Sequence, residues 1–419
     1  MKKKKPEIRF NGFEGEWEEK VLKEVAKLRR GLTYSPVDIC NAREGIRVLR
    51  SSNIAEDIFS LSEDDVFVKP SAVNIPYIRN YDILITAANG SFRLVGKHCL
   101  VSDIQPNSCV PGGFMLCAST DSPLFLQASM SSSWYQTFIA TYTLGGNGSI
   151  GNLSKTALEE QRFHIPSVPE QEKIGLFLTT LDKLIAKLEA KLDKLRKLKQ
   201  ALLEKMFANV NRGGYETPEI RFKGYTDKWQ VKELRELAMR VVSKNEDNRV
   251  TLPLTISAQY GLISQTDFFN NRIAAKDVRK YYVIKKGEFA YNRSTSEGSP
   301  FGAVKRLDRY NAGVLSTLYL VFRISSEEID SNYLVCYFST DSWHKHIEEN
   351  AAEGARNHGL LNITSEDFFT TPIKVPMKKE EQSKVALSIR TLENILSKTS
   401  TKLTKLRNIK QSLLQKMFA

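Results

Sequence analysis

The chain has 419 residues, of which 41% are hydrophobic and 26% are charged, and this balance excludes a disordered or fibrous protein. Its 61 Lys and Arg residues outnumber the 48 Asp and Glu residues by 13, which favours a polyanionic partner. No apolar run reaches the roughly 18 residues that a membrane-spanning helix needs, and no export signal is visible. The five cysteines form no CxxC pair and are expected to be reduced thiols of a cytoplasmic protein.

The first feature along the chain is a segment that occurs twice. PEIRFNGFEGEW at residues 6–17 returns as PEIRFKGYTDKW at residues 218–229. Further on, NLSKTALEEQRFHIP at residues 152–166 aligns without a gap with NITSEDFFTTPIKVP at residues 362–376. Because repeats of this length mark duplicated structural units, the chain is predicted to consist of two related halves of about 210 residues each. Each half has an opening segment, a globular region and a closing helix.

The globular regions are predicted to be α/β in class. Residues 81–101 have the pattern of strand, turn and strand, and residues 286–307 and 314–324 have the same pattern with different loop residues. Residues 13–28 and 332–349 are expected to be helical. The predicted division is a first globular region at 1–166, a helix at 167–208, a linker at 209–217, a second globular region at 218–376 and a second helix at 377–419.

The two closing helices each carry one narrow apolar stripe, which predicts a two-stranded coiled coil. Both end in nearly the same words, KQALLEKMFA and KQSLLQKMFA, and Thr399 interrupts the second stripe. Since the end of the first helix leads into the second globular region, which then feeds the second helix, the two helices are expected to be antiparallel and to act as a spacer. The expected seam residues are Leu181, Leu184, Leu188, Leu192, Leu195, Leu198, Leu202, Met206, Leu392, Ile395, Leu403, Leu406, Ile409, Leu413 and Met417.

Two other motifs suggest different chemistry. His98, Cys99, Cys109 and Cys117 could form a zinc site, although their spacing is not that of known ligand pairs. Gly146, Gly148 and Gly151 form a GxGxxG sequence, which is typical of dinucleotide binding, but no such glycines stand at the same place in the second half. Neither pattern recurs in both halves, so we expect no metal site, no cofactor in this chain and no catalytic residues.

The combination of these marks resembles the specificity (S) subunit of type I restriction-modification enzymes. The marks are the IPxxPEQxKI entry to the first long helix at residues 165–174, its looser copy VPMKKEEQSKV at residues 375–385, the KQxLLxKMF endings and the duplicated layout. The resemblance implies two target recognition domains, each of which reads one half of a bipartite DNA sequence. It also implies docking of methyltransferase subunits on the helical spacer, restriction (motor and nuclease) subunits in the complex, and S-adenosylmethionine, ATP and Mg²⁺ on those partners in a prokaryotic cell.

Residues that read DNA are expected in the loops that differ between the halves, where basic and amide side chains can contact phosphates and base edges. An alternative is a non-catalytic coiled-coil scaffold that holds two protein- or ligand-binding domains, and steep salt dependence of duplex binding would distinguish the two. The outer faces of the helices, with Lys187, Lys191, Lys194 and Arg196, are expected to dock partners. The candidate DNA-binding residues are Arg43, Arg47, Asn89, Ser91, Arg93 and Lys97 in the first half, and Arg249, Gln259, Arg293, Ser294, Ser296 and Arg356 in the second.

Overall fold

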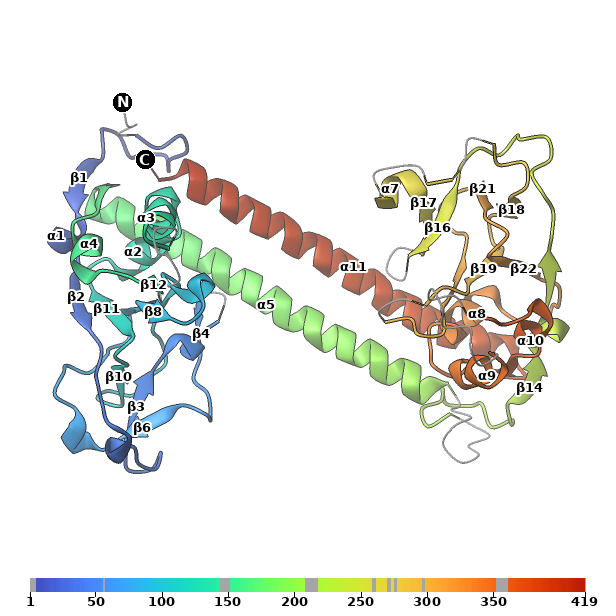
Figure 1. Ribbon diagram of the computed structural model, residues 1–419, viewed down its shortest axis with the longest axis horizontal. Helices are drawn as coiled ribbons and strands as arrows, with labels where there is room; N and C mark the ends of the chain where they lie inside the picture. Colours follow the sequence, from blue (N-terminus) through green and yellow to red (C-terminus); the bar gives the residue numbers. More distant parts are fainter. Residues whose placement is uncertain are drawn as a thin grey trace. The chain divides into compact units, whose positions relative to one another are not determined.

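The computed structural model describes residues 5–55, 57–143, 151–207, 218–257, 261–269, 273–274, 277–295, 298–351 and 361–418. The chain divides into two compact units (Figure 1). Unit 1 contains residues 1–190 and 401–419, and unit 2 contains residues 191–400. Each unit therefore includes part of both long helices, α5 (Val168–Met206) and α11 (Lys379–Lys416).

Unit 1 is built on a four-stranded antiparallel sheet in the order β2-β11-β7-β9, beside a three-stranded sheet in the order β10-β3-β6. All four residues of β7 are buried, because alternate side chains enter different cores. Ile83 and Ile85 pack with the helices, whereas Leu84 packs with Cys99 and Cys117 on the other face. The strands are β1 (Glu18–Val21), β2 (Lys27–Arg30), β3 (Ile46–Leu49), β4 (Ile54–Ala55), β5 (Ile58–Phe59), β6 (Val66–Val68), β7 (Ile83–Thr86), β8 (Ala88–Asn89), β9 (His98–Leu100), β10 (Cys109–Pro111), β11 (Met115–Ser119), β12 (Gly151–Asn152) and β13 (Arg162–Ile165).

Unit 2 repeats this plan, with a four-stranded antiparallel sheet in the order β15-β22-β19-β20. Phe289 and Tyr291 of β19 pack against the helices and Ala290 faces the second core, as on β7. Two smaller sheets pair β16 with β17 and β18 with β21. The strands are β14 (Gln230–Glu233), β15 (Ala238–Val241), β16 (Leu254–Ser257), β17 (Gly261–Ser264), β18 (Tyr282–Lys285), β19 (Phe289–Asn292), β20 (Ala303–Arg306), β21 (Ala312–Leu315), β22 (Leu320–Ile324) and β23 (Pro372–Val375).

The shorter helices of unit 1 are α1 (Leu22–Val25), α2 (Pro123–Met130), α3 (Ser133–Thr143) and α4 (Lys155–Glu159), with 3-10 turns at Pro36–Asp38, Ser51–Asn53, Pro70–Ala72 and Phe92–Leu94. Those of unit 2 are α6 (Leu234–Leu237), α7 (Gln265–Phe269), α8 (Ser331–Tyr337), α9 (His344–Asn350) and α10 (Ser365–Phe369). Among the described residues, α1 to α4 of unit 1 correspond in chain order to α6, α8, α9 and α10 of unit 2, and α7 has no such counterpart. The predicted helix at 13–28 is wrong: this stretch forms β1, one turn of α1 and the first two residues of β2, because β1 pairs with the distant β13. The stretch 332–349 forms two helices rather than one.

In both units the long helices pair in antiparallel fashion. In unit 1, Asp182 Oδ1 of α5 lies 2.5 Å from Lys410 Nζ of α11. Further along α5, Glu189 Oε1 lies 2.6 Å from Arg407 Nη2, which comes before Lys410 in α11. In unit 2, Lys199 of α5 lies 2.6 Å from Glu393 of α11. The predicted antiparallel pairing is therefore observed in each unit.

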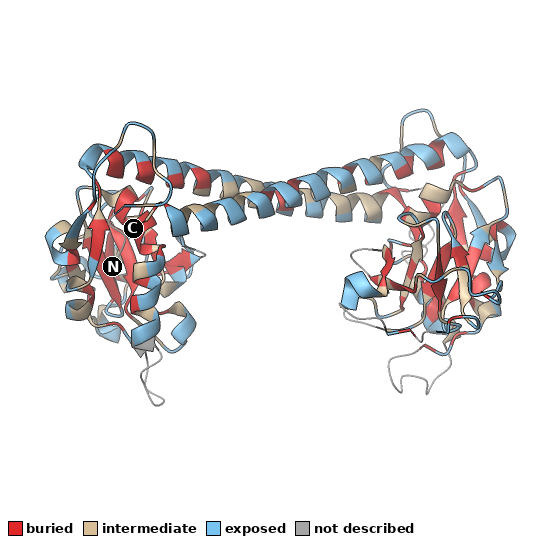
Figure 2. Ribbon diagram, turned by 90° about the horizontal axis from the view of Figure 1, so that it is seen from above, coloured by how far each residue is buried: buried red, intermediate tan, exposed pale blue. Residues whose placement is uncertain are grey.

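The apolar seam differs from the predicted one at four positions. Leu184, Leu198, Ile395 and Ile409 are 38–50% exposed, as Figure 2 illustrates with pale blue on the outer faces of both long helices. Their places in the seam are taken by Ile185, Lys199, Leu396 and Lys410, each of which is half-buried. The buried positions then alternate steps of four and three residues, which keeps the seam on one face of each helix. The other predicted seam residues, and Thr399, are buried or half-buried.

None of the helices within the described ranges is long and apolar enough to cross a membrane.

Candidate nucleic-acid interface

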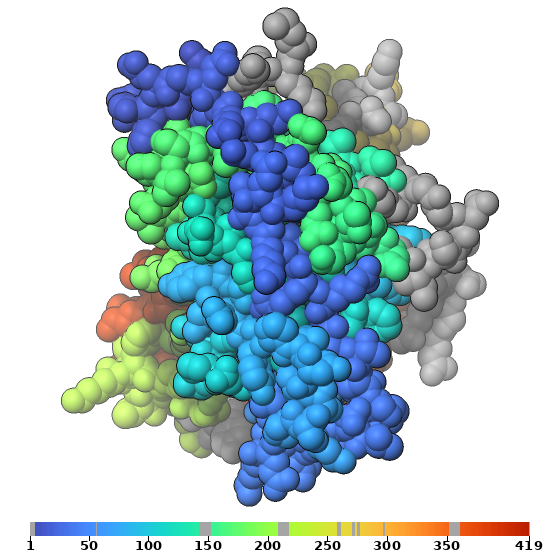
Figure 3. Space-filling view, turned by 90° about the vertical axis from the view of Figure 1, so that its left-hand side faces the viewer, coloured from blue at the N-terminus to red at the C-terminus, as the bar shows by residue number. Residues whose placement is uncertain are grey.

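The repeated PEIRF segment fixes the two long helices to each unit. In unit 1, the guanidinium of Arg9 donates twice to the buried carboxylate of Glu170 in the first turn of α5, at 2.7 Å each. The backbone amide of the preceding residue, Ile8, donates to Lys416 O at the end of α11, at 3.0 Å. Figure 3 shows this opening segment, in dark blue, beside the green residues that include the start of α5.

Unit 2 repeats these contacts. Arg221 donates twice to the buried Glu381 of α11, at 2.7 and 2.9 Å, and Ile220 N donates to Lys205 O of α5, at 2.9 Å. Both Glu side chains lie in the first turn of their helix, where a negative charge is stabilised by the helix dipole. The segment therefore ties the start of one long helix to the end of the other, which explains why its sequence recurs almost unchanged.

The two units also share a polar turn after a central strand. In unit 1, the amide of Ser91 donates to Asn89 Oδ1 at 2.9 Å, and in unit 2 the amide of Ser294 donates to Asn292 Oδ1 at 3.1 Å. A later segment of the chain is hydrogen-bonded to the backbone beside each turn: Leu153 N donates to Ala87 O, and Leu361 N donates to Arg293 O. Asn89, Ser91 and Ser294, which were predicted from sequence, therefore lie in equivalent turns.

The remaining candidates of the first half separate into exposed and structural side chains. Arg43 and Arg93 are exposed, and Lys97 is half-buried behind the Asn89 turn. Arg47 instead lies on β3, donates to the buried carboxylate of Asp65 and to Ser62 O, and stacks 4.6 Å from the Phe67 ring. These contacts give Arg47 a structural role in unit 1, and its contact with DNA stays a prediction.

In the second half, Arg249 is exposed and forms a surface ion pair with Asp247, a contact of little energetic weight. The guanidinium of Arg293 donates to Leu318 O and to Ile363 O, at 3.1 Å each, so this side chain clamps two backbone segments together. Arg293 therefore has a structural role, and its contact with DNA stays a prediction. Gln259, Ser296 and Arg356 lie outside the described residues.

A cleft in unit 1 adds residues that the sequence did not indicate. It has a volume of about 730 Å³ and lies where the loop after β2, the start of β11 and the Asn89 turn meet. The amide of Asn89 donates to Ser51 Oγ at 2.9 Å within its lining. The lining includes Tyr34, Val48, Arg50, Ser51, Asn89 and Phe114. A largely apolar wall with one guanidinium and one amide is able to contact both the faces and the edges of a base.

The zinc alternative does not fit the geometry. No group of three or more His, Cys, Asp or Glu side chains that could hold a metal occurs within the described residues. Cys99 and Cys117 lie in the apolar core between the sheets, where burial raises the pKa of Cys99 to about 12 and that of Cys117 further. His98 faces the opposite side of β9, beside Tyr135, where burial lowers its pKa. Of the GxGxxG sequence, Gly146 and Gly148 lie outside the described residues, and Gly151 begins β12.

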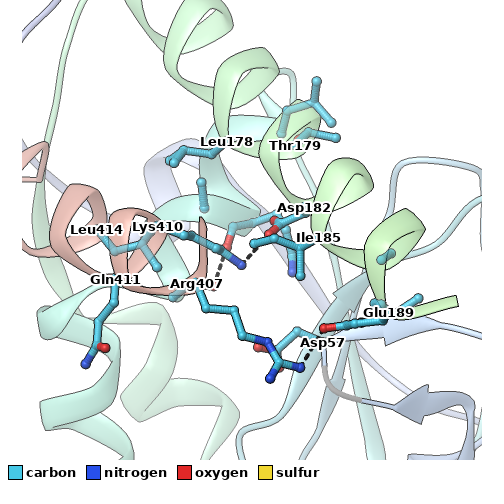
Figure 4. A pocket seen from close by; sticks show the side chains of 16 residues that line it. Asp57, Leu178, Thr179, Asp182, Ile185, Glu189, Arg407, Lys410, Gln411 and Leu414 are labelled. Atoms are coloured by element: carbon cyan, nitrogen blue, oxygen red, sulfur yellow. Dashed lines mark hydrogen bonds and ion pairs between the residues drawn. The ribbon is translucent and has the colours of Figure 1, made fainter. Parts of the chain in front are cut away.

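Most of the positive charge lies on the long helices. α5 has nine basic and six acidic residues, and α11 has nine basic and three acidic residues, so the two helices carry +9 of the net +13. Part of it is used in the seam, where Lys410–Asp182 and Lys199–Glu393 occupy equivalent positions. Figure 4 shows Lys410 and Arg407 reaching Asp182 and Glu189 at a cavity of about 290 Å³ in unit 1. Burial raises the pKa of Asp182, although Lys410 opposes that shift.

The outer faces of α5 and α11 are alike. We define the outer stripe of α5 as Leu176, Thr180, Leu184, Lys187, Lys191, Lys194 and Leu198, and that of α11 as Leu387, Thr391, Ile395, Lys398, Lys402, Lys405 and Ile409. All fourteen residues are exposed. Five of the seven pairs are identical, and the other two exchange Leu for Ile. Within the described chain, the lysines of these stripes have no ion-pair partner.

A second stripe on each helix is mostly exposed, with Thr179 and Ala186 half-buried, and its residues differ between the two helices. We define the flank stripe of α5 as Thr179, Lys183, Ala186, Ala190, Asp193 and Lys197, and that of α11 as Arg390, Asn394, Ser397, Thr401, Thr404 and Asn408. No pair is identical. Because solvent exposure alone permits this divergence, the likeness of the outer stripes requires another cause.

The chain thus has two α/β units with a common frame and different loops, and each unit contains part of both long helices. A family model described as the type I restriction modification DNA specificity domain matches residues 14–197. The chain is 23% identical to the type I restriction enzyme StySPI specificity subunit of Salmonella potsdam, over 96% of this chain and 88% of that protein. It is also 23% identical to the MjaVIII specificity subunit of Methanocaldococcus jannaschii, over 62% of this chain and 61% of that protein.

The fold has a solved counterpart in the crystal structure of the type I restriction-modification system S subunit from M. genitalium. The TM-score is 0.59 at 13% sequence identity, and the match covers 99% of each chain. The chain is therefore similar in sequence to type I restriction enzyme specificity subunits, and it shares the fold of the M. genitalium S subunit.

Proposed function

We propose that this protein selects the DNA sequence on which a type I restriction-modification complex acts, with one half of an asymmetric, bipartite target read by each unit. The observation that carries this proposal is a common frame around two different sets of loops. The Arg–Glu anchors, the sheet order and the Asn-x-Ser turns recur in both units, whereas the loops beside those turns differ. Such an arrangement holds two different readers in the same way.

We further propose that the outer stripes dock methyltransferase subunits, one on each long helix. An exposed row of Leu or Ile with three lysines suits an amphipathic helix that has an apolar face and acidic edges. The Leu176 and Leu387 side chains are 62% and 67% exposed, so covering them would remove apolar area from water on binding. Since the two stripes match, each would take the same partner, and two copies would bind. The helical pair would then serve both as a spacer and as the dock.

Catalysis is assigned to the partners in this proposal. The methyltransferase subunits would bind S-adenosylmethionine and methylate adenine in the two half-sites, and restriction subunits would supply ATP- and Mg²⁺-dependent cleavage. The purified chain, incubated alone with S-adenosylmethionine and duplex DNA, should then transfer no methyl group. Measurable turnover by the chain alone would contradict this assignment.

Selection of bound duplexes from a random pool, with the methyltransferase subunit present, tests DNA reading directly. We expect two short specified blocks separated by an unspecified gap, and affinity that falls steeply between 50 and 200 mM salt because phosphate contacts release counterions. A coiled-coil scaffold for proteins or small ligands would select no sequence and would show no duplex binding above background.

A further inference from the structure

The turn that leads into the central strand β11 of unit 1 has an equivalent in unit 2. We call residues 112–115 and 316–319 the tip turns. Each is closed by one backbone hydrogen bond, from Met115 N to Gly112 O at 2.8 Å and from Tyr319 N to Ser316 O at 3.1 Å. The third residue of each tip turn is a large apolar one that points into solvent: Phe114 is 75% exposed and Leu318 is 53% exposed.

Both tip turns are held firmly in place. Phe114 O accepts hydrogen bonds from Ala87 N and Ala88 N, at 2.8 and 3.0 Å. Behind it the backbones of Gly31 and Gly112 are in close contact, because a Cβ on Gly31 would lie 1.9 Å from Gly112 O. In unit 2, Leu318 O accepts a hydrogen bond from Arg293 Nε, so this side chain supports the tip turn. A firmly held turn cannot fold its apolar side chain back into the core.

Single exposed apolar residues are common and by themselves indicate nothing. Here, however, the same turn position is apolar and exposed in both units, and each lies next to an Asn-x-Ser turn. In unit 1 the cleft of about 730 Å³ also opens beside Phe114, with Arg50 and Asn89 in its lining. The position therefore combines a rigid apolar side chain with hydrogen-bonding groups in both units.

We propose that Phe114 and Leu318 contact the bases of the two half-sites as apolar wedges, a role that rests on the proposed DNA-reading function. Phe114 stacks on a base at a partly unstacked step, and the cleft beside it accommodates that base while Arg50 and Asn89 face its edge. Leu318 fills the same place in unit 2 but has no ring to stack, so it provides apolar contact only. The two side chains thereby contribute to the different preferences of the two units.

The test uses the full chain with its methyltransferase subunit and compares Phe114→Ala and Leu318→Ala with wild type. Competition binding is measured against duplexes in which one half-site is varied base by base and the other is kept constant. Phe114→Ala should lose discrimination on the order of 10-fold within one half-site and none in the other, because the wedge requires an unstacked step and the cost of unstacking depends on the sequence of that step. Leu318→Ala should lose a smaller factor within the other half-site, and Phe114→Trp should retain discrimination.

Leu61→Ala in unit 1 and Val242→Ala in unit 2 are matched controls, because these residues are 45% and 56% exposed and lie outside the tip turns. Both should bind as wild type does. Unchanged discrimination in Phe114→Ala, while wild type still selects its target, would overturn the wedge and leave the DNA-reading proposal intact. An equal loss in both half-sites would also overturn it. If wild type shows no sequence preference, the proposed function itself fails.

Discussion

The two units are most alike where they hold the long helices and least alike where they face away from them. Arg9–Glu170 and Arg221–Glu381 match in both bonds and burial, and Ile8 and Ile220 make the same backbone contact to the other helix. At the tip turns, by contrast, unit 1 has Phe114 where unit 2 has Leu318. The carbonyl of Phe114 accepts hydrogen bonds from two backbone amides, whereas the carbonyl of Leu318 accepts one from the Arg293 side chain.

Under the proposed function, this difference would allow one frame to carry two binding preferences. A change at a buried charged anchor leaves an uncompensated charge, which costs several kcal/mol, so the anchors resist divergence. A change at an exposed turn costs little stability, so the turns are free to diverge. The frame and the loops are therefore separable parts of each unit.

Exchange of one globular region, with the Arg–Glu anchors and the long helices left in place, should have the largest effect. Replacing residues 27–158 by residues 239–368 would place two copies of the second reader in one chain. We expect the chimaera to prefer a symmetric, inverted target with its methyltransferase subunit bound, as measured by selection from a random duplex pool. Retention of the original asymmetric preference would mean that recognition lies outside the exchanged segments.

Removal of a buried Arg–Glu anchor should have a smaller effect than the exchange. The loss of stability should be equal in the two units. Glu170→Gln and Glu381→Gln each leave an Arg without its carboxylate, and we expect each to lower the free energy of unfolding by about 3 kcal/mol. Glu172→Gln, two residues further along α5 and exposed, is the control and should change it by less than about 0.5 kcal/mol. Denaturant unfolding of the full chain measures both, and a large effect in one unit alone would show that the anchors are not equivalent.

Charge reversal on an outer stripe should have the smallest effect. Lys187, Lys191 and Lys194 changed together to Glu should weaken one methyltransferase contact by about tenfold, since exposed charges at an interface contribute modestly. The matching change at Lys398, Lys402 and Lys405 should weaken the other. Sedimentation of the mixture would then show complexes with one partner copy in place of two. Lys183→Glu with Lys197→Glu, on the flank stripe, is the control, and equal weakening by it would remove the distinction between the stripes.

The duplication, the α/β class and the long antiparallel helices could be predicted from the sequence because they depend on local periodicity and on repeated words. The predicted seam was wrong at Leu184 and Leu198 because leucine occurs on both the inner and outer faces of α5. The sequence pattern gave no reason to place Lys199 rather than Leu198 in the seam. Only the partner carboxylates, Glu393 for Lys199 and Asp182 for Lys410, make lysine favourable there.

The candidate interface was predictable in part. The turn positions of Asn89 and Ser294 could be predicted because amide and hydroxyl side chains favour turns. The structural contacts of Arg47 and Arg293 could not be predicted, because their partners, Asp65 and the carbonyls of Leu318 and Ile363, come from other parts of the fold. Phe114 was missed because an apolar residue beside a strand is expected to be buried, and nothing in its neighbours signals that it faces solvent.

The ends of the long helices complete cores that belong to the other half of the sequence. Met417 is buried in unit 1, and the Phe418 ring lies 5.8 Å from that of Phe125 and 6.3 Å from that of Trp17. During synthesis, all of residues 191–400 must be translated before these side chains leave the ribosome. At 5–20 residues per second this takes roughly 10–40 s. During this time the core formed by residues 1–190 lacks the side chains that the end of α11 contributes. The nascent first half is thus a stage at which chaperones or premature aggregation can act, whereas Met206 and Phe207 are already present when unit 2 emerges.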